Sequence, residues 1–342
     1  MHNHGIMGGM FGMDSCGFIR QPQPPFLKEP CLKLINGRSG FHVLIELLRP
    51  ATTWVPAYLC HSITDAIRRA KGSLSYYPIN ARLQVGGRDW IRSVRAGDLV
   101  VFIDYFGFDL HREAMAEVKA RGATVLQDAA QSLLSTFERP YADYVLYSPR
   151  KFLGVPDGGI LQARGARDFS GVKLVDAPPE YLLAAMRAFN ERTWFDRTGT
   201  GEWYSHYQAA EALSPIGAFR MTSLTAALLQ NSFDYARIAR RRVANYNRLF
   251  SGLPGLALLG KLPAKTVPLG FPIAGSSRLS LCKKLYDVQC FCPVHWPMPA
   301  DVPDGFREAR RLSSEELTLL CDQRCTSTQI DAMIDIVKGE FG

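Results

Sequence analysis

Residues 124–131 read Thr-Val-Leu-Gln-Asp-Ala-Ala-Gln, and residues 144–151 read Tyr-Val-Leu-Tyr-Ser-Pro-Arg-Lys. Each stretch opens with β-branched, aromatic and leucine side chains, which is typical of a buried strand. Each then breaks into small and polar residues, with Asp128 at the first break and Lys151 soon after the second. We therefore predict that an acid and an amine stand at the carboxyl ends of two strands.

The surrounding segments alternate between strand-like and helix-like patterns. Leu99–Ile103 is an apolar run that ends at Asp104, and residues 110–121 form an amphipathic helical pattern. This alternation predicts an α/β fold, with a mainly parallel central sheet and helices on both faces. Ligands of such sheets bind beyond the carboxyl ends of the strands. Asp104, Asp128 and Lys151 are all expected at that edge.

The rest of the chain suggests how it is divided. We predict an N-terminal arm over residues 1–30, a large domain over 31–250 and a smaller C-terminal α+β domain over 251–342. A single long helix is expected over 222–250, because Ser-Gly-Leu-Pro-Gly follows it at 251–255.

The start of the large domain carries a second signal. Residues 36–40 read Asn-Gly-Arg-Ser-Gly and precede an apolar run over 41–48, so a helix is expected to begin there. The backbone N–H groups of such a helix start suit a phosphate, although most such starts bind nothing.

Bulk composition excludes several classes of protein. The chain has 342 residues, of which 47% are hydrophobic and 21% are charged, as in ordinary globular proteins. It contains no run of eighteen apolar residues, and residues 1–14 lack the pattern of a signal peptide. We expect a cytoplasmic protein without a membrane partner. His2 and His4 could bind metal, but a mobile N-terminal start is favoured.

The cysteines and the basic residues point to no special partner. The 8 cysteines form no CxxC pair, so reduced thiols are expected and no metal site is predicted. The net charge is +8, and the densest basic run is Arg240–Arg242. Because this run lacks interleaved aromatic residues, no nucleic-acid partner is expected. It could be a solvated helix face, or part of a field that attracts a small anionic substrate.

The chemistry of Asp128 and Lys151 suggests a cofactor. An amine beside a buried carboxylate is the pair that pyridoxal 5'-phosphate (PLP) requires. The amine forms a Schiff base, and the carboxylate keeps the pyridine nitrogen protonated.

Several motifs resemble one known family, the DegT/DnrJ/EryC1/StrS aminotransferases. These are fold-type-I PLP enzymes that mostly aminate nucleotide-linked keto-sugars, and the resemblance covers roughly residues 34–255. The motifs that carry it are Asn36-Gly37-Arg38-Ser39-Gly40, Val55-Pro56-Ala57-Tyr58, Asp104-Tyr105-Phe106-Gly107-Phe108, Gln127-Asp128-Ala129-Ala130-Gln131, Ser148-Pro149-Arg150-Lys151 and Val155-Pro156-Asp157-Gly158-Gly159.

The resemblance implies roles for the residues around the cofactor. Lys151 would hold PLP and later act as the general base, and Asp128 would pair with the pyridinium nitrogen. Gln131 would contact the ring hydroxyl.

Further roles concern the phosphate and the face of the ring. Ser39, Gly40 and Ser148 would hold the phosphate. His61 would stack on the ring, although a histidine at a helix start is nearly as expected.

The chain departs from the family before the predicted long helix. Ala218 stands where the family often has an asparagine that reaches the neighbouring subunit's phosphate. Arg220 or Asn231 could replace that contact. The resemblance also implies a homodimer with the active site at its interface.

The expected activity is transfer of an amino group from an amino acid, with L-glutamate as donor, to a nucleotide-linked keto-sugar. Two alternatives stay open. A PLP enzyme of the same fold could act on a non-sugar intermediate or perform dehydration, although the dehydratase relatives carry a histidine in place of the lysine. The chain could also be a non-catalytic PLP-fold protein. A dinucleotide-binding dehydrogenase is disfavoured because no G-x-G-x-x-G follows the first strand.

Overall fold

The computed structural model describes residues 6–13, 17, 19 and 22–341. The possible metal ligands His2 and His4 lie outside the described residues, as do residues 1–5 and 14 of the start predicted to be mobile over residues 1–14. In the part that is described, no helix is both long and apolar enough to cross a membrane.

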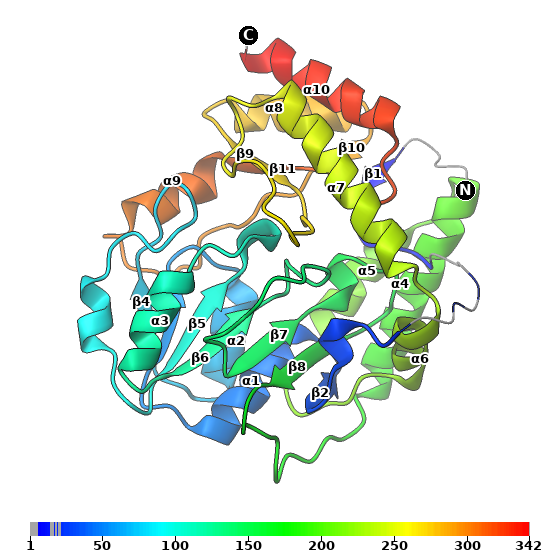
Figure 1. Ribbon diagram of the computed structural model, residues 1–342. Helices are drawn as coiled ribbons and strands as arrows, with labels where there is room; N and C mark the ends of the chain where they lie inside the picture. Colours follow the sequence, from blue (N-terminus) through cyan, green and yellow to red (C-terminus); the bar gives the residue numbers. More distant parts are fainter. Residues whose placement is uncertain (1–5, 14–16, 18, 20–21, 342) are drawn as a thin grey trace.

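A central sheet dominates the molecule (Figure 1). Its five neighbouring strands from β4 to β7 are parallel, β8 is antiparallel to β7, and β2 is antiparallel to β8. In spatial order the sheet consists of β2 (Cys31–Leu34), β8 (Gly159–Ala163), β7 (Tyr144–Tyr147), β6 (Thr124–Asp128), β5 (Leu99–Ile103), β3 (Thr53–Pro56) and β4 (Leu74–Tyr77). The mixed α/β class with a mainly parallel sheet is therefore confirmed.

Two inner strands, β5 and β7, carry apolar or aromatic side chains along their whole length because both of their faces are covered. All five residues of β5 are buried, and so are all four of β7. α1 (Gly37–Leu48) contacts β7, β8 and α2 (His61–Arg69), whereas α3 (Arg112–Ala120) contacts β6. Covered parallel strands of this kind read as continuous hydrophobic runs rather than alternating ones.

Two further helices fill the segment between residues 165 and 215, whose sequence shows little periodicity. α4 (Pro179–Thr198) and α5 (Trp203–Leu213) pack against each other as a hairpin at one side of the sheet (Figure 1). This hairpin leaves several large apolar side chains exposed, among them Leu183 and Trp194.

The single helix predicted over 222–250 is wrong. The segment forms α6 (Ser223–Asn231) and α7 (Tyr235–Gly252), which are separated by a short turn. Asp234 caps α7, since its side chain accepts a hydrogen bond from the Arg237 N–H, and such caps begin a new helix. The apolar periodicity continued across the turn because Phe233 is buried within it.

The C-terminal part packs beyond the carboxyl edge of the sheet (Figure 1). α10 lies against α7 and α8. The small sheet β9–β11 is antiparallel. The elements of this part are β9 (Phe271–Ala274), α8 (Arg278–Asp287), β10 (Cys290–Phe291), α9 (Arg307–Glu315), β11 (Glu316–Leu319) and α10 (Ser327–Phe341). The predicted boundary at 250/251 stays a prediction.

The described part of the N-terminal arm is not free of the fold. β1 (Met7–Gly8) pairs in parallel with β10, and the Met7 side chain is buried. Residues 6–13 therefore bridge to the C-terminal part, which a proline-rich lead-in does not predict.

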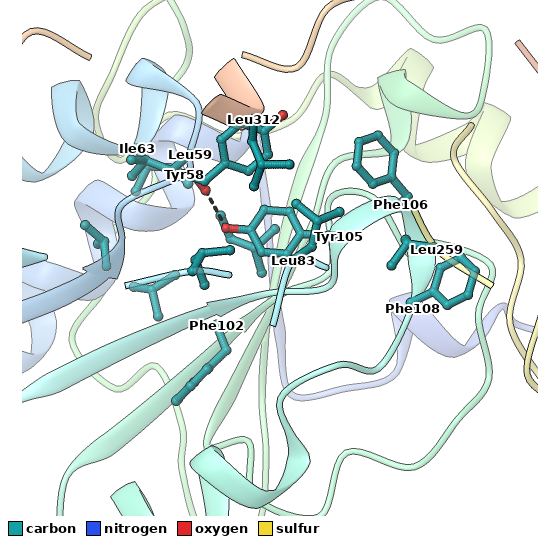
Figure 2. Packing of buried hydrophobic residues seen from close by; sticks show 14 of the residues in the cluster. Tyr58, Leu59, Ile63, Leu83, Phe102, Tyr105, Phe106, Phe108, Leu259 and Leu312 are labelled. Carbon is teal, nitrogen blue, oxygen red and sulfur yellow. Dashed lines mark hydrogen bonds between the residues drawn. The ribbon is translucent and has the colours of Figure 1, made fainter. Parts of the chain in front are cut away.

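The hydrophobic core joins the sheet to the C-terminal part. Phe102, Phe106 and Phe108 lie in β5 and the turn after it, and Leu259 lies beside Phe108 (Figure 2). The Tyr105 hydroxyl donates a hydrogen bond to the Tyr58 carbonyl within this cluster. The turn that follows β5 is thus a rigid base for whatever binds at the sheet edge.

Candidate active site

A cavity of about 1050 Å³ opens at the carboxyl edge of the central sheet. Its walls come from the ends of β6 and β7, the starts of α1 and α2, helix α5, the N-terminal segment and the C-terminal part. The lining residues used below are Phe11, Gly37, Arg38, His61, Asp128, Gln131, Ser148, Arg150, Lys151, Glu211, Arg242, His295, Trp296, Thr318 and Arg324. The sequence prediction that Asp128 and Lys151 share one edge is confirmed by this geometry.

Lys151 stands on a short 3₁₀ turn directly after β7. Pro149 begins the turn, and the Lys151 N–H donates to the Ser148 carbonyl at 3.2 Å. The side chain is half-buried and lines the cavity. The turn therefore directs a primary amine from the sheet edge into an enclosed space.

Asp128 is the last residue of β6 and is 5% exposed. Its Oδ1 accepts a hydrogen bond of 3.0 Å from the Ala130 N–H. Burial raises the pKa of Asp128 to about 6, against the opposing effect of the Lys151 charge. A protonated ring nitrogen placed beside this carboxylate would offset the cost of its burial.

Asp104, which directly follows the neighbouring strand β5, has another role. It is buried, and it accepts hydrogen bonds from Gln127, Ser132 and Arg139. It does not line the cavity. Two acids at equivalent strand ends therefore differ, since one faces the cavity and the other stabilises the turn beneath it.

Gln131 lines the cavity and carries a buried hydrogen-bond donor without a partner among the described residues. Its Oε1 accepts from the Phe106 N–H at 2.6 Å, which fixes the amide orientation. Its Nε2 is buried and has no partner among the described residues. A buried amide without a partner is costly, so a ligand oxygen at this position is favoured. A PLP ring hydroxyl would satisfy it.

The start of α1 lies beside Lys151, but its exposed residues differ from those predicted. Asn36 caps the helix by accepting the Ser39 N–H at 2.8 Å. Gly37 and Arg38 line the cavity, whereas Ser39 is fully buried and Gly40 packs against Leu146. The orphaned N–H groups of a first turn suit a phosphate. The role predicted for Ser39 and Gly40 stays a prediction, and Ser148 does line the cavity.

Two arginines and one glutamate form a charged cluster beside this helix start. Arg150 pairs with Glu211 at 2.6 Å, and Arg38 pairs with the same carboxylate at 3.3 Å. Burial lowers the pKa of Arg150 and the Glu211 charge raises it, with a net rise. The cluster keeps one net positive charge on the cavity wall. Sequence reasoning missed it because Glu211 lies on a distant helix.

The remaining predicted residues separate into two groups. His61, the first residue of α2, is exposed at the cavity wall, where it could meet a ring. Arg220 does not line the cavity; its guanidinium donates to the Leu174 carbonyl at 2.5 Å and pairs with Asp176 at 3.3 Å. Their predicted contacts with the cofactor stay predictions.

The basic run Arg240–Arg242 is not a fully solvated face. Arg242 is 0% exposed and donates to Gln323 at 2.9 Å and to the Leu269 carbonyl at 3.1 Å. It also lines the cavity, and its guanidinium lies 4.3 Å from the centre of the Phe152 ring. The solvated interpretation fits Arg240 and is wrong for Arg242.

The N-terminal segment covers part of the cavity mouth. Arg324 donates to the Met10 carbonyl at 3.0 Å, and its guanidinium lies 3.8 Å from the centre of the Phe11 ring. Gly12 lies so close to Gly154 that a Cβ on Gly154 would meet its carbonyl oxygen at 1.8 Å. No sequence pattern predicted that residues 9–11 would reach this site.

Comparison with known proteins identifies the fold. No protein-family model matches the chain, and no curated protein matches its sequence. Solved structures do match. DesV of S. venezuelae superposes with a TM-score of 0.68 at 16% identity, covering 95% of this chain and 91% of that one. This chain has the fold of the sugar aminotransferases.

Two more structures agree. A DegT DnrJ EryC1 StrS aminotransferase from Brucella abortus gives a TM-score of 0.64 at 13% identity and covers 90% of this chain and 85% of its own. Helicobacter pylori PseC, an aminotransferase involved in the biosynthesis of pseudoaminic acid, gives 0.67 at 13% identity, with coverage of 91% and 86%. The fold-type-I aminotransferase architecture predicted from the sequence motifs is thus confirmed.

Proposed function

We propose that the protein is a PLP-dependent aminotransferase that transfers an amino group from an amino acid to a keto-sugar. The observation that carries the proposal is the convergence of Lys151, Asp128 and the unpartnered Nε2 of Gln131 on one cavity of a sugar-aminotransferase fold. These are the amine, carboxylate and donor that PLP chemistry uses.

Each residue has a distinct task. When bound, PLP supplies an aldehyde that takes up amines and a ring that accepts electrons. Lys151 would hold the cofactor through its amine and, once released, that amine would carry the proton that moves during the transfer. Asp128 keeps the ring nitrogen protonated, because its buried carboxylate is stabilised by a cation. Gln131 orients the ring through its free amide donor.

The cavity wall favours an anionic acceptor. Arg38 and Arg150 share the single carboxylate of Glu211, so the cluster retains positive charge next to the start of α1. The volume of about 1050 Å³ is at the upper end for small-molecule sites, which leaves room for more than the cofactor. We propose a nucleotide-linked keto-sugar as acceptor and L-glutamate as donor.

A homodimer is proposed as the active form. The α4–α5 hairpin exposes 73% of Leu183, 58% of Trp194 and 56% of Tyr204, and Tyr204 also lines the cavity. Apolar side chains of this size on a helical hairpin favour burial against a partner. Sedimentation of the full chain tests this, and a monomer that binds PLP tightly would contradict it.

The central test is spectroscopic. The full chain mixed with PLP should show the visible absorbance of lysine-bound cofactor, and L-glutamate should bleach it in a single turnover while 2-oxoglutarate appears. Lys151→Ala should lack the band, whereas Lys173→Ala, at an exposed position, should keep it. A band in Lys151→Ala and none in Lys173→Ala would refute the assignment. Dehydration without 2-oxoglutarate would favour the alternative PLP reaction.

A further inference from the structure

Three side chains of the C-terminal part form a hydrogen-bonded chain that leads from the cavity into the protein. His295 Nδ1 lies 2.7 Å from Thr318 Oγ1, and the Thr318 hydroxyl in turn bonds to Glu316 Oε1. The other oxygen of Glu316 accepts a hydrogen bond from the backbone N–H of His295 at 2.7 Å. Glu316 is 0% exposed, whereas His295 and Thr318 line the cavity.

The chain holds the His295 ring in one orientation. Phe106 and Trp296 contact the ring edge-on, with centroid distances of 5.4 and 5.3 Å. With Nδ1 committed to Thr318, the other nitrogen, Nε2, has no partner among the described residues. His295 and Lys151 share the cavity and lie close enough for their charges to interact. A ring so fixed leaves Nε2 free for a group bound in the cavity that His295 and Lys151 both line.

The polarity of the chain has two possible settings. If Glu316 is ionised, Thr318 donates to it and must accept from His295 Nδ1–H, so Nε2 is an acceptor. If Glu316 is protonated, it donates to Thr318, which donates to His295 Nδ1, so Nε2–H is a donor. The protonation of Glu316 therefore selects the tautomer of His295 without charging the ring.

The surroundings of Glu316 and of His295 allow Glu316 to gain or lose its proton near neutral pH. Burial raises the pKa of Glu316 to about 8, opposed by the Thr318 hydroxyl, the His295 N–H and the charge of Arg278 on α8. Tyr58 and Cys282 also face this carboxyl. At the cavity end, burial and the Lys151 charge lower the pKa of His295 to about 3, so the ring stays neutral.

We propose that His295, Thr318 and Glu316 are a proton relay that exchanges one proton with an oxygen of the substrate bound beside Lys151. In the outward direction Nε2–H gives its proton to that oxygen, Thr318 passes its proton to Nδ1, and Glu316–H passes its proton to Thr318. One O–H bond forms at the substrate, one breaks at Glu316, and no electrons are transferred. The substrate in this relay rests on the proposed function, since an acceptor ketone must lose its oxygen as water. Lys151 would then be free to move the proton on the substrate carbon.

A measurement that needs no activity tests the chain itself. In the full protein as purified, labelled with ¹⁵N-histidine, the His295 Nε2 resonance should move from the protonated to the unprotonated position between pH 6.5 and pH 9.5. His295→Gln identifies the signal. Thr318→Val should abolish the change, because a methyl group cannot pass a proton. One tautomer at both pH values, or a change that survives in Thr318→Val, overturns the relay.

A matched control separates this effect from loss of a buried hydroxyl. Thr53 in β3 is buried like Thr318, and its hydroxyl has no partner among the described residues. Thr53→Val should leave the His295 signal and its pH change as in the parent protein. A lost pH change in Thr53→Val would show a general disturbance and would count against the relay.

Kinetics connect the relay to the reaction. Thr318→Val should lower the single-turnover rate about 10- to 100-fold in both half-reactions, because the acceptor ketone loses its oxygen as water and the 2-oxoglutarate formed from L-glutamate takes up an oxygen from water. An unchanged rate in either half-reaction would overturn the assignment to the substrate oxygen. If no turnover occurs in the parent protein, the proposed function fails. The tautomer measurement still tests the hydrogen-bonded relay of His295, Thr318 and Glu316.

Discussion

Two walls of the cavity differ in how far the sequence alone predicts their residues. The sheet-edge wall carries Asp128, Gln131 and Lys151, which lie within one stretch of the chain at the ends of β6 and β7. The C-terminal wall carries His295 and Thr318, which come from a loop and from β11. The order of the strands positions the residues of the sheet-edge wall. The residues of the C-terminal wall are positioned by the packing of the C-terminal part onto the sheet edge. The sequence motifs therefore predicted the residues of the sheet-edge wall, and they did not predict the residues of the C-terminal wall.

The largest effect should come from the sheet-edge wall. Asp128→Asn removes the charge that keeps the cofactor nitrogen protonated, so we expect the catalytic rate to fall on the order of 10²–10³-fold. Asp104→Asn is the matched control at the neighbouring strand end; it should lower the melting temperature and leave the rate per folded molecule nearly unchanged. Similar rate losses in both would remove the distinction between cavity-facing and structural acids. Rates and melting curves of both variants make the check.

The next largest effect concerns the contact of helix α7 with the C-terminal part. Arg242→Met deletes the hydrogen bonds to Gln323, Pro268 and Leu269 from a fully buried position. Unfolding free energy should fall by about 2–4 kcal/mol, because the acceptors lose their partners. Arg240→Met, at an exposed position of the same helix, should change it by less than about 0.5 kcal/mol. Denaturant titration measures both, and equal losses would contradict the buried role.

The pH dependence of stability sharpens the view of the C-terminal wall. The pKa of Glu316 is raised from 4.5 to about 8, so between these values the folded state binds more protons than the unfolded state. Stability is then lost as the pH rises through that window. His295 and His111, whose pKa values are lowered, act in the opposite direction only below about pH 6.5.

The prediction therefore uses the range from pH 6.5 to 8. Glu316 should contribute a loss of about 1–2 kcal/mol there, and Glu316→Gln should remove most of that slope. Denaturant titrations of the protein without added cofactor, at several pH values, measure it. An unchanged slope in Glu316→Gln would show that the carboxyl does not titrate in this range.

The smallest effect lies far from both walls. Thr53 buries a hydroxyl without a partner among the described residues. Thr53→Val should raise the unfolding free energy by about 1 kcal/mol, because a methyl group of similar size needs no hydrogen bond. A thermal melt detects this. A decrease would mean that the hydroxyl has a partner, such as an ordered water.

Several elements could be predicted because their signals are local. The runs before Asp104, Asp128 and Lys151 predicted the inner strands, and the helix predicted between Asp104 and Asp128 accounts for the parallel order of β5 and β6. The helix over 222–250 could not be divided correctly, since periodicity continued through the turn at Phe233. Arg242 and Arg240 look alike in sequence, and only packing against Phe152 and Gln323 distinguishes them.

The sequence by itself determined the α/β class, the strand ends and the pair formed by Asp128 and Lys151. Strand patterns and turn residues act over a few positions, so they can be read locally. Only the tertiary structure decided that His295 and Thr318 would face Lys151 and that residues 9–11 would reach the same cavity. Such contacts join segments far apart in the chain, and the burial that favours them is non-directional, so no local spacing records it.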